Sequence, residues 1–219
     1  MEDSPWKAKK VVELLAESHY RPKSICEVGC GAGGVLAALS HFFPEAELFG
    51  YEVARDAEEF WGAHKETHIH FAVGDFFELN QRHFDVLLLI DVVEHLENPF
   101  AFLRRLREYG RFFVFHIPLD LSAINVLRKS PLLRVRSRVG HLHYFTKGLA
   151  LSLLEECRYH ILDCRYTGAA FTSPKHNWKT RLAALPRRLA YSVNKDFGVR
   201  VLGGETLMIL AQARNASGY

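Results

Sequence analysis

Short apolar segments alternate with helical patterns along the first half of the chain, and this alternation restricts the fold more than any other feature. Segments typical of strands lie at 24–29, 47–52, 68–75, 84–90 and 111–118. Segments whose apolar residues recur at helical spacing lie at 7–17, 34–43, 55–65 and 97–108. Strands that alternate with helices form a mostly parallel sheet with helices on both faces. We therefore predict a three-layer, doubly wound α/β fold whose ligands bind at the carboxyl ends of the strands.

The second half of the chain departs from this pattern after Pro118. Residues 146–157 predict a helix with Thr146 as its N-cap, and 159–167 and 204–213 predict two final strands. The segment 119–145, which precedes this helix, indicates one short helix. The segment 168–203, which separates the two final strands, is rich in proline, glycine and basic residues. We expect one domain over residues 1–219, with the segments 119–145 and 168–203 forming a small cap on the side where the acceptor binds.

Composition excludes several classes of protein. The chain has 219 residues, of which 48% are hydrophobic, and a net charge of +3 that does not call for a nucleic-acid partner. Its four cysteines form no C-x-x-C pair, which argues against zinc-ribbon and thioredoxin sites. The charged start and the acids that interrupt the most apolar run predict a cytoplasmic protein without a membrane-spanning segment.

A glycine-rich turn lies between the first predicted strand and the following helix, in the sequence EVGCGAGG at 27–34. Gly29, Gly31 and Gly34 fit the spacing of a dinucleotide-binding turn, whereas Gly29, Gly31 and Gly33 fit that of an S-adenosylmethionine turn. Both turns let backbone N–H groups approach a ligand closely. The glycines alone do not distinguish the two cofactors.

Acidic residues follow or end the neighbouring strands. Glu27 lies inside the first apolar strand, where a buried acid needs a partner. Glu52 ends the second strand, 21 positions after Gly31, where a carboxylate can accept hydrogen bonds from ribose hydroxyls, as it does in NAD sites. Asp75 ends the third strand, and IDVVEHLENP after the fourth places Asp91, Glu94 and His95 at the ligand-facing edge. Each acid alone has a structural explanation, such as a turn or an ion pair, but together they favour a nucleoside site.

The segments EVGCGAGG, GYE, GDFF, IDVVEHLENP and GHLHYFTKGLALSLLEEC together resemble class I S-adenosylmethionine-dependent methyltransferases. The resemblance is greatest to the small-molecule branch that includes the ubiquinone-biosynthesis O-methyltransferases. It covers residues 22–165 and the last strand, and it implies a seven-stranded, Rossmann-like sheet whose final strand, 204–213, is antiparallel.

The resemblance also implies S-adenosylmethionine as cofactor, S-adenosylhomocysteine as product, and a set of contacts to them. Those at the methionine end are Glu27, Gly29, Cys30, Gly31 and Gly33. Those at the ribose and adenine are Glu52, Val53, Asp75 and Phe76. Those beside the methionine are Asp91, Val92 and His95. Val53 and Ala54 stand where many relatives have a small polar pair, so the details around the ribose are the part least fixed by the resemblance.

Histidines are the candidate general bases, because their ordinary pKa lies near neutrality. His141 and His143 alternate in GHLHYFT, His116 ends the fifth strand, and His95 follows the fourth. The structural alternative for each is a hydrogen-bonded histidine without a catalytic role. Two histidines do not make a metal site without further ligands, and no acidic or cysteine partner is near them in sequence, so we predict a site without metal.

The acceptor is predicted to be a small molecule, methylated on a hydroxyl oxygen, that is anionic or glycosylated, such as a lipid-linked or saccharide precursor. Acid-free basic runs such as 127–138 and 175–189 are usually solvated surface; the alternatives are a surface for an anionic substrate, which motivates this prediction, and peripheral contact with a membrane. The alternatives are an NAD-dependent oxidoreductase and a non-catalytic cofactor-binding or protein-interaction domain. No signature of an RNA methyltransferase is present, and the sequence does not determine the oligomeric state.

Overall fold

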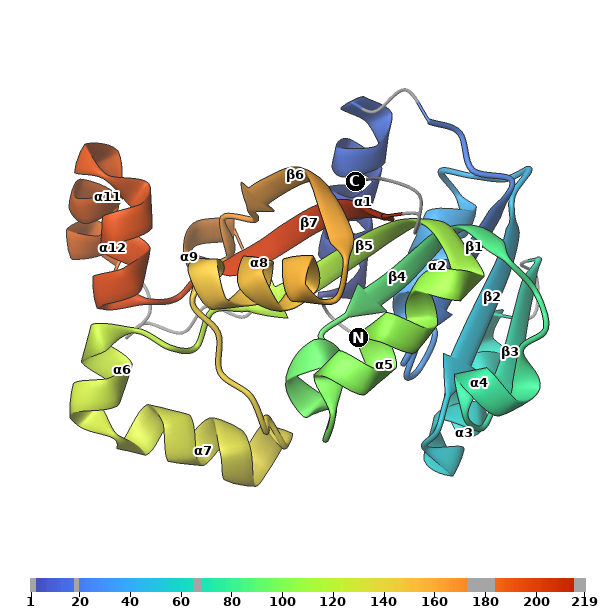
Figure 1. Cartoon of the computed structure of the whole chain (residues 1–219), viewed down its shortest axis with the longest axis horizontal. Coiled ribbons are helices and arrows are strands. Elements are labelled where there is room, and N and C mark those ends of the chain that lie inside the picture. The colour runs from blue at the N-terminus through green and yellow to red at the C-terminus, as the bar shows by residue number, and fades with distance from the viewer. Residues whose placement is uncertain (1–2, 18–19, 65–67, 173–183, 215–219) are drawn as a thin grey trace.

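A seven-stranded sheet forms the centre of the molecule, in the order β3-β2-β1-β4-β5-β7-β6 (Figure 1). The computed structural model describes residues 3–17, 20–64, 68–172 and 184–214. Five strands run parallel: β1 (Ser24–Val28), β2 (Glu47–Glu52), β3 (Ile69–Val73), β4 (Phe84–Ile90) and β5 (Gly110–Pro118). The antiparallel strand β7 (Thr206–Ala213) lies between β5 and β6 (Tyr159–Tyr166). The predicted seven-stranded sheet with an antiparallel final strand is confirmed.

Helices cover both faces of the sheet. On one face lie α1 (Ser4–Glu17) and α2 (Gly34–Ser40), whose buried residues pack with alternate residues of the strands. On the other face lie α4 (Phe76–Leu79), α5 (Pro99–Leu106) and α8 (Lys147–Glu156). In β4, Val86 and Leu88 face the first layer while Leu87 and Leu89 face the second. Apart from Asp85 near its start, this strand is apolar because successive side chains point to opposite, equally buried faces.

The short elements between β2 and β5 differ in part from the prediction. The single helix expected at 55–65 is three short pieces in the described residues, namely η1 (Arg55–Ala57), α3 (Glu58–Trp61) and η2 (Gly62–His64). The turn after β4 is η3 (Val93–His95), and η4 (Arg107–Tyr109) extends α5. Asn98 caps α5, with its side chain accepting a hydrogen bond from Ala101 N, and Pro99 occupies the first turn.

The segments that follow β5 and β6 fold into helices at one end of the molecule, on the left of Figure 1. The segment 119–145 contains two helices rather than one, α6 (Ala123–Arg128) and α7 (Ser130–Val139), joined at Lys129 with φ +55°. The described part of 168–203 contains α9 (Ala169–Thr172), α11 (Ala184–Val193) and α12 (Lys195–Leu202). Part of the basic run 175–189 lies outside the described residues. None of the described helices is long and apolar enough to cross a membrane.

Candidate active site

The glycine loop 29–33 connects β1 to α2 at the carboxyl edge of the sheet. Gly29, Gly31 and Gly33 have φ of +77°, +50° and +76°, a region that glycine adopts without steric cost. A Cβ atom on Gly29 would lie 2.7 Å from Val92 Cγ2, and one on Gly33 would lie 2.5 Å from the ring of Phe71. A Cβ on Gly31 would meet no described atom within 4 Å. The loop is therefore packed at both ends and open in the middle, where a ligand can approach its backbone.

Glu52 is held directly against this loop. Gly31 N donates to Glu52 Oε2 at 2.8 Å, and Ala54 N donates to Oε1 at 2.9 Å. The loop is supported from the other side by Trp61 Nε1, which donates to Gly31 O at 2.9 Å. Each carboxylate oxygen keeps a lone pair for a further donor, as a ribose contact requires. The side chain of Val53, by contrast, is 70% exposed.

Glu27 is the buried acid of β1. It is only 2% exposed, and its Oε2 has no hydrogen-bond partner among the described residues. Burial raises its pKa to about 8, although the charge of Lys7 opposes this shift. Burial also raises the pKa of the neighbouring Cys30 thiol, which therefore stays neutral. Because a buried carboxyl without a partner is costly, a ligand ammonium beside Glu27 would be stabilised here.

Asp91 follows β4 and joins two other elements of the site. It has φ +56°, and its carboxylate contacts Lys7 Nζ and His116 Nδ1, each at 2.5 Å. Burial alone would raise its pKa, but His116 and Lys7 hold the pKa well below the usual range. His116 Nε2 lies 2.8 Å from Thr206 Oγ1, so both ring nitrogens of His116 are engaged. This arrangement suits a positioning role for His116 better than proton removal from an acceptor.

Asp75 and Phe76 lie where β3 gives way to α4. Asp75 is exposed and caps the helix, accepting from Phe77 N at 2.6 Å. Phe76 is 3% exposed and packs edge-on against Tyr51 and Tyr109 in the core. Asp75 can therefore reach a ligand at this edge, whereas the ring of Phe76 supports the floor beneath it.

A second polar cluster surrounds His141, where the segment after α7 returns to the sheet edge. His141 Nδ1 lies 2.7 Å from Asp120 Oδ2, and its Nε2 lies 4.0 Å from Glu94 Oε1. The ring of His95 approaches that of His141 edge-on, with centroids 4.8 Å apart. His143 points elsewhere, with Nε2 2.9 Å from Leu96 O.

Asp120 is the member of this cluster that the sequence did not identify, whereas Glu94 was expected at the ligand-facing edge without an assigned role. Glu94 is fully buried, and neither carboxylate oxygen has a hydrogen-bond partner among the described residues. Burial and the nearby Asp91 raise its pKa to about 9. Its position beside His95 in IDVVEHLENP was the available signal. Asp120 lies in an irregular segment and carried no such signal.

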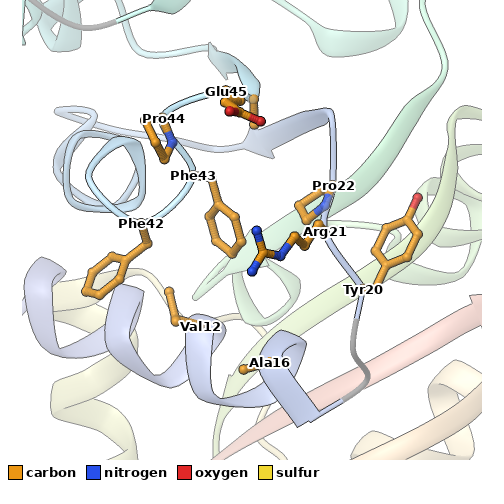
Figure 2. Close-up of a pocket in the computed structure, with 10 residues that line it drawn as sticks. Val12, Ala16, Tyr20, Arg21, Pro22, Phe42, Phe43, Pro44 and Glu45 are labelled. Atoms are coloured by element: carbon orange, nitrogen blue, oxygen red, sulfur yellow. The ribbon is translucent and has the colours of Figure 1, made fainter.

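A separate hollow of about 490 Å³ lies away from this edge (Figure 2). Figure 2 shows Phe43 and Arg21 facing the hollow above Val12 and Ala16 of α1. Its residues Pro22 and Ala46 come just before β1 and β2, so it lies at the amino edge of the sheet. The candidate site is therefore defined by the loop, the acids and the histidines, and not by this hollow.

Residues 4–156 match the model of a family described as a methyltransferase domain. The chain belongs to this methyltransferase family. The predicted resemblance to class I S-adenosylmethionine-dependent methyltransferases is thereby confirmed, and with it the enzyme class and the cofactor. The oxidoreductase alternative finds no support. The branch with the ubiquinone-biosynthesis enzymes stays a prediction.

Solved structures share the fold of this methyltransferase at low sequence identity. The plantazolicin methyltransferase BpumL, in complex with a monoazolic desmethylPZN analog and SAH, is 16% identical, with a TM-score of 0.63 over 97% of this chain and 86% of that one. An S-adenosylmethionine-dependent methyltransferase from Clostridium acetobutylicum is 11% identical, with a TM-score of 0.61 over 98% and 93%. The mitomycin 7-O-methyltransferase MmcR is 18% identical, with a TM-score of 0.60 over 96% and 54%. A comparison with curated proteins finds no significant match.

Proposed function

We propose that this methyltransferase methylates a hydroxyl oxygen of a small molecule that is anionic or carries a saccharide. The observation that carries the cofactor half of the proposal is the Glu52 carboxylate, hydrogen-bonded to Gly31 N of the glycine loop. This contact brings together the two groups that would bind S-adenosylmethionine. The carboxylate would accept hydrogen bonds from the ribose hydroxyls, and the open backbone turn would face the methionine moiety.

We assign each residue at the carboxyl edge of the sheet to a different part of the cofactor. The unpartnered Oε2 of Glu27 suits the ammonium of the methionine moiety, next to the loop of Gly29, Cys30, Gly31 and Gly33. Glu52 suits the ribose and Asp75 the adenine amino group. Asp91 and Val92 border the methionine through their backbone, and His95 lies just beyond them.

Methyl transfer is an in-line displacement, so positioning contributes most of what the protein can add. Bound S-adenosylmethionine supplies an electrophilic methyl carbon on a sulfonium. The acceptor oxygen forms the new C–O bond as the C–S bond breaks, with the electron pair staying on sulfur and the hydroxyl proton leaving. His141 is the histidine best arranged to act on that hydroxyl, because Asp120 fixes its Nδ1 while Nε2 faces the edge beside Glu94. His143 and His116 are bound to other groups.

The charge of the cap supports an anionic acceptor. The five cations of the run 127–138 are all exposed, and no acid occurs between residues 121 and 154. They are Arg128, Lys129, Arg134, Arg136 and Arg138. This face also carries exposed Leu127 and Val126, at 86% and 53%, which suits an acceptor with a lipid portion or peripheral contact with a membrane. The related plantazolicin and mitomycin enzymes are named for small-molecule substrates, which agrees with this class of acceptor.

The proposal is tested by calorimetry followed by turnover. We expect S-adenosylhomocysteine to bind the protein and NADH not to bind. Glu52→Ala is expected to weaken S-adenosylhomocysteine binding by about tenfold or more, the loss of a charge-assisted hydrogen-bond pair. Glu47→Ala, at the exposed start of the same strand, is the matched control and should bind normally. Equal affinity in both variants would remove Glu52 from the site. Binding without any formation of S-adenosylhomocysteine from S-adenosylmethionine across anionic and saccharide acceptors would favour a non-catalytic domain.

A further inference from the structure

We infer that Glu94, His95 and His141 form a site for one divalent first-row transition-metal cation, of the zinc class, at the acceptor side of the active site. One ligand atom from each of these residues lies within 4.8 Å of the others. A tetrahedral zinc ion with bonds of about 2.0–2.2 Å places its ligand atoms about 3.4 Å apart. Small side-chain rotations are therefore enough to close the three groups around a cation.

The metal-free prediction depended on the lack of an acidic neighbour for the histidines in sequence. The fold removes that argument, because it brings Glu94 and Asp120 to His141 from two different segments. The charges that act on Glu94 are those of Asp91, Asp120 and Lys7, and Arg136 donates to Leu142 O next to His141. Glu94 itself is fully buried with two unpartnered oxygens among the described residues. A cation bound between them supplies the partner that this carboxylate lacks.

The hydrogen bonds of the two histidines provide an independent observation. His141 Nδ1 faces the Asp120 carboxylate at 2.7 Å, and His95 Nδ1 faces the Gly140 carbonyl at 3.2 Å. A carbonyl or an ionised carboxylate only accepts hydrogen bonds, so each Nδ1 must carry the proton. In the neutral form of each ring, which is the form that binds a metal, Nε2 then keeps its lone pair. Metal-ligating histidines are oriented by an outer carboxylate or carbonyl in this same manner.

The backbone presents the ligands as well. Leu142 N and His143 N both donate to Glu94 O, at 2.8 and 3.0 Å, so the segment after α7 is fixed to the turn after β4. Gly140 ends α7 with φ +85° and turns the chain so that His141 reaches the sheet edge. The cation would thus bind where the cap meets the sheet. Its ligand Glu94 lies three residues after Asp91 in the sequence.

Two imidazoles and one carboxylate select the metal class. Magnesium and calcium prefer all-oxygen sites, whereas zinc and its neighbours take nitrogen together with oxygen. Three protein ligands leave at least one coordination position for another molecule. In a step that rests on the proposed methyl transfer, the acceptor hydroxyl takes that position. Coordination then lowers the pKa of the hydroxyl and its proton passes to the solvent, so that with a metal bound His141 serves as a ligand and no longer as the base itself.

The test is calorimetric titration of zinc chloride into the tag-free 219-residue protein after treatment with EDTA, with magnesium chloride as a comparison. We expect one zinc ion to bind at micromolar affinity or tighter, with no binding of magnesium at that level. His95→Ala and Glu94→Gln should each weaken zinc binding at least about tenfold. His143→Ala is the matched control, because this histidine lies in the same segment but hydrogen-bonds Leu96 O, and it should keep zinc binding.

Failure to bind zinc, or binding that neither His95→Ala nor Glu94→Gln weakens, overturns the inference. Magnesium binding as tight as zinc overturns the assignment of metal class. Since Glu94 is buried, circular dichroism of Glu94→Gln checks that it folds, and the partly exposed His95 provides a second variant. S-Adenosylhomocysteine affinity, measured on the same samples, separates the two proposals. Normal affinity without zinc binding removes only the metal site, and zinc binding without S-adenosylhomocysteine binding removes only the proposed cofactor site.

Discussion

The two sides of the carboxyl edge are built in different ways. On the cofactor side, the loop after β1 and Glu52 at the end of β2 belong to neighbouring parallel strands in a regular strand–helix–strand unit. On the acceptor side, His141 and Asp120 lie in the segment between β5 and α8, which has no periodic frame. Both contacts span 21 residues, so sequence separation does not distinguish them. The difference is that the carboxyl ends of parallel strands always meet at one edge of the sheet. The position of an inserted segment, by contrast, is known only from the structure.

The largest effect should come from breaking the cofactor side at Gly29. Gly29→Val places a branched side chain at φ +77°, with its Cβ 2.7 Å from Val92 Cγ2. We expect S-adenosylhomocysteine binding to fall by about 100-fold or more, because both the backbone conformation and the space are incompatible with the side chain. Calorimetry measures the loss.

Gly148→Ala is the control for this substitution. Gly148 lies in α8, and a Cβ there would come no closer than 4.0 Å to Thr146 Oγ1. Alanine at a helical position should stabilise the fold slightly and leave binding unchanged. If Gly29→Val bound S-adenosylhomocysteine as tightly as Gly148→Ala, the loop would not approach the cofactor.

The same difference explains which parts of the molecule could be predicted. Periodicity was enough to find the seven strands and to place Glu52 at the end of β2 and Asp75 just after β3; their contacts with the cofactor stay a prediction. It did not reveal that Phe76 turns into the core, because the Asp75 cap begins a helix there. It also did not connect Lys7 to Asp91, 84 positions away, since only the packing of α1 on the sheet brings them together.

On the acceptor side, Asp120→Asn should reduce turnover without affecting the cofactor. Asparagine keeps the size of Asp120 but removes the charge that fixes the His141 ring. We expect kcat to fall by about 10- to 100-fold, the usual cost of losing an orienting partner, with unchanged S-adenosylhomocysteine affinity. Glu155→Gln, exposed on α8, is the control and should keep full activity. An equal loss of cofactor affinity in Asp120→Asn would show that the two sides are not separable.

The buried carboxyl group of Glu27 should affect how the free energy of unfolding depends on pH. Burial raises the pKa of Glu27 to about 8, so the folded protein holds this proton over a range in which the unfolded chain, with a pKa near 4.5, releases it. The contribution to stability is complete below about pH 4.5 and is lost as the pH rises through 8. Glu27→Gln should therefore show a smaller decrease in unfolding free energy between pH 5 and 8, measured by urea denaturation. The raised pKa of Glu94 leaves part of the slope in place. Glu47→Gln serves as the exposed control, and a Glu27→Gln slope equal to that of this control would contradict a raised pKa for Glu27.

The smallest effect should come from the surface of the cap. Removing three cations of α7, with Arg134, Arg136 and Arg138 all replaced by alanine, takes away charges that are exposed and screened by salt. We expect KM for an anionic acceptor to rise about three- to tenfold at low salt, with less change at high salt, while KM for S-adenosylmethionine stays the same. The double variant Arg104→Ala, Arg105→Ala removes two exposed cations from α5, which lies outside the cap, and should leave acceptor KM unchanged. If the α7 variant behaved like the α5 variant, the basic run would be solvated surface only, and the acceptor would be recognised entirely by the cluster around His141.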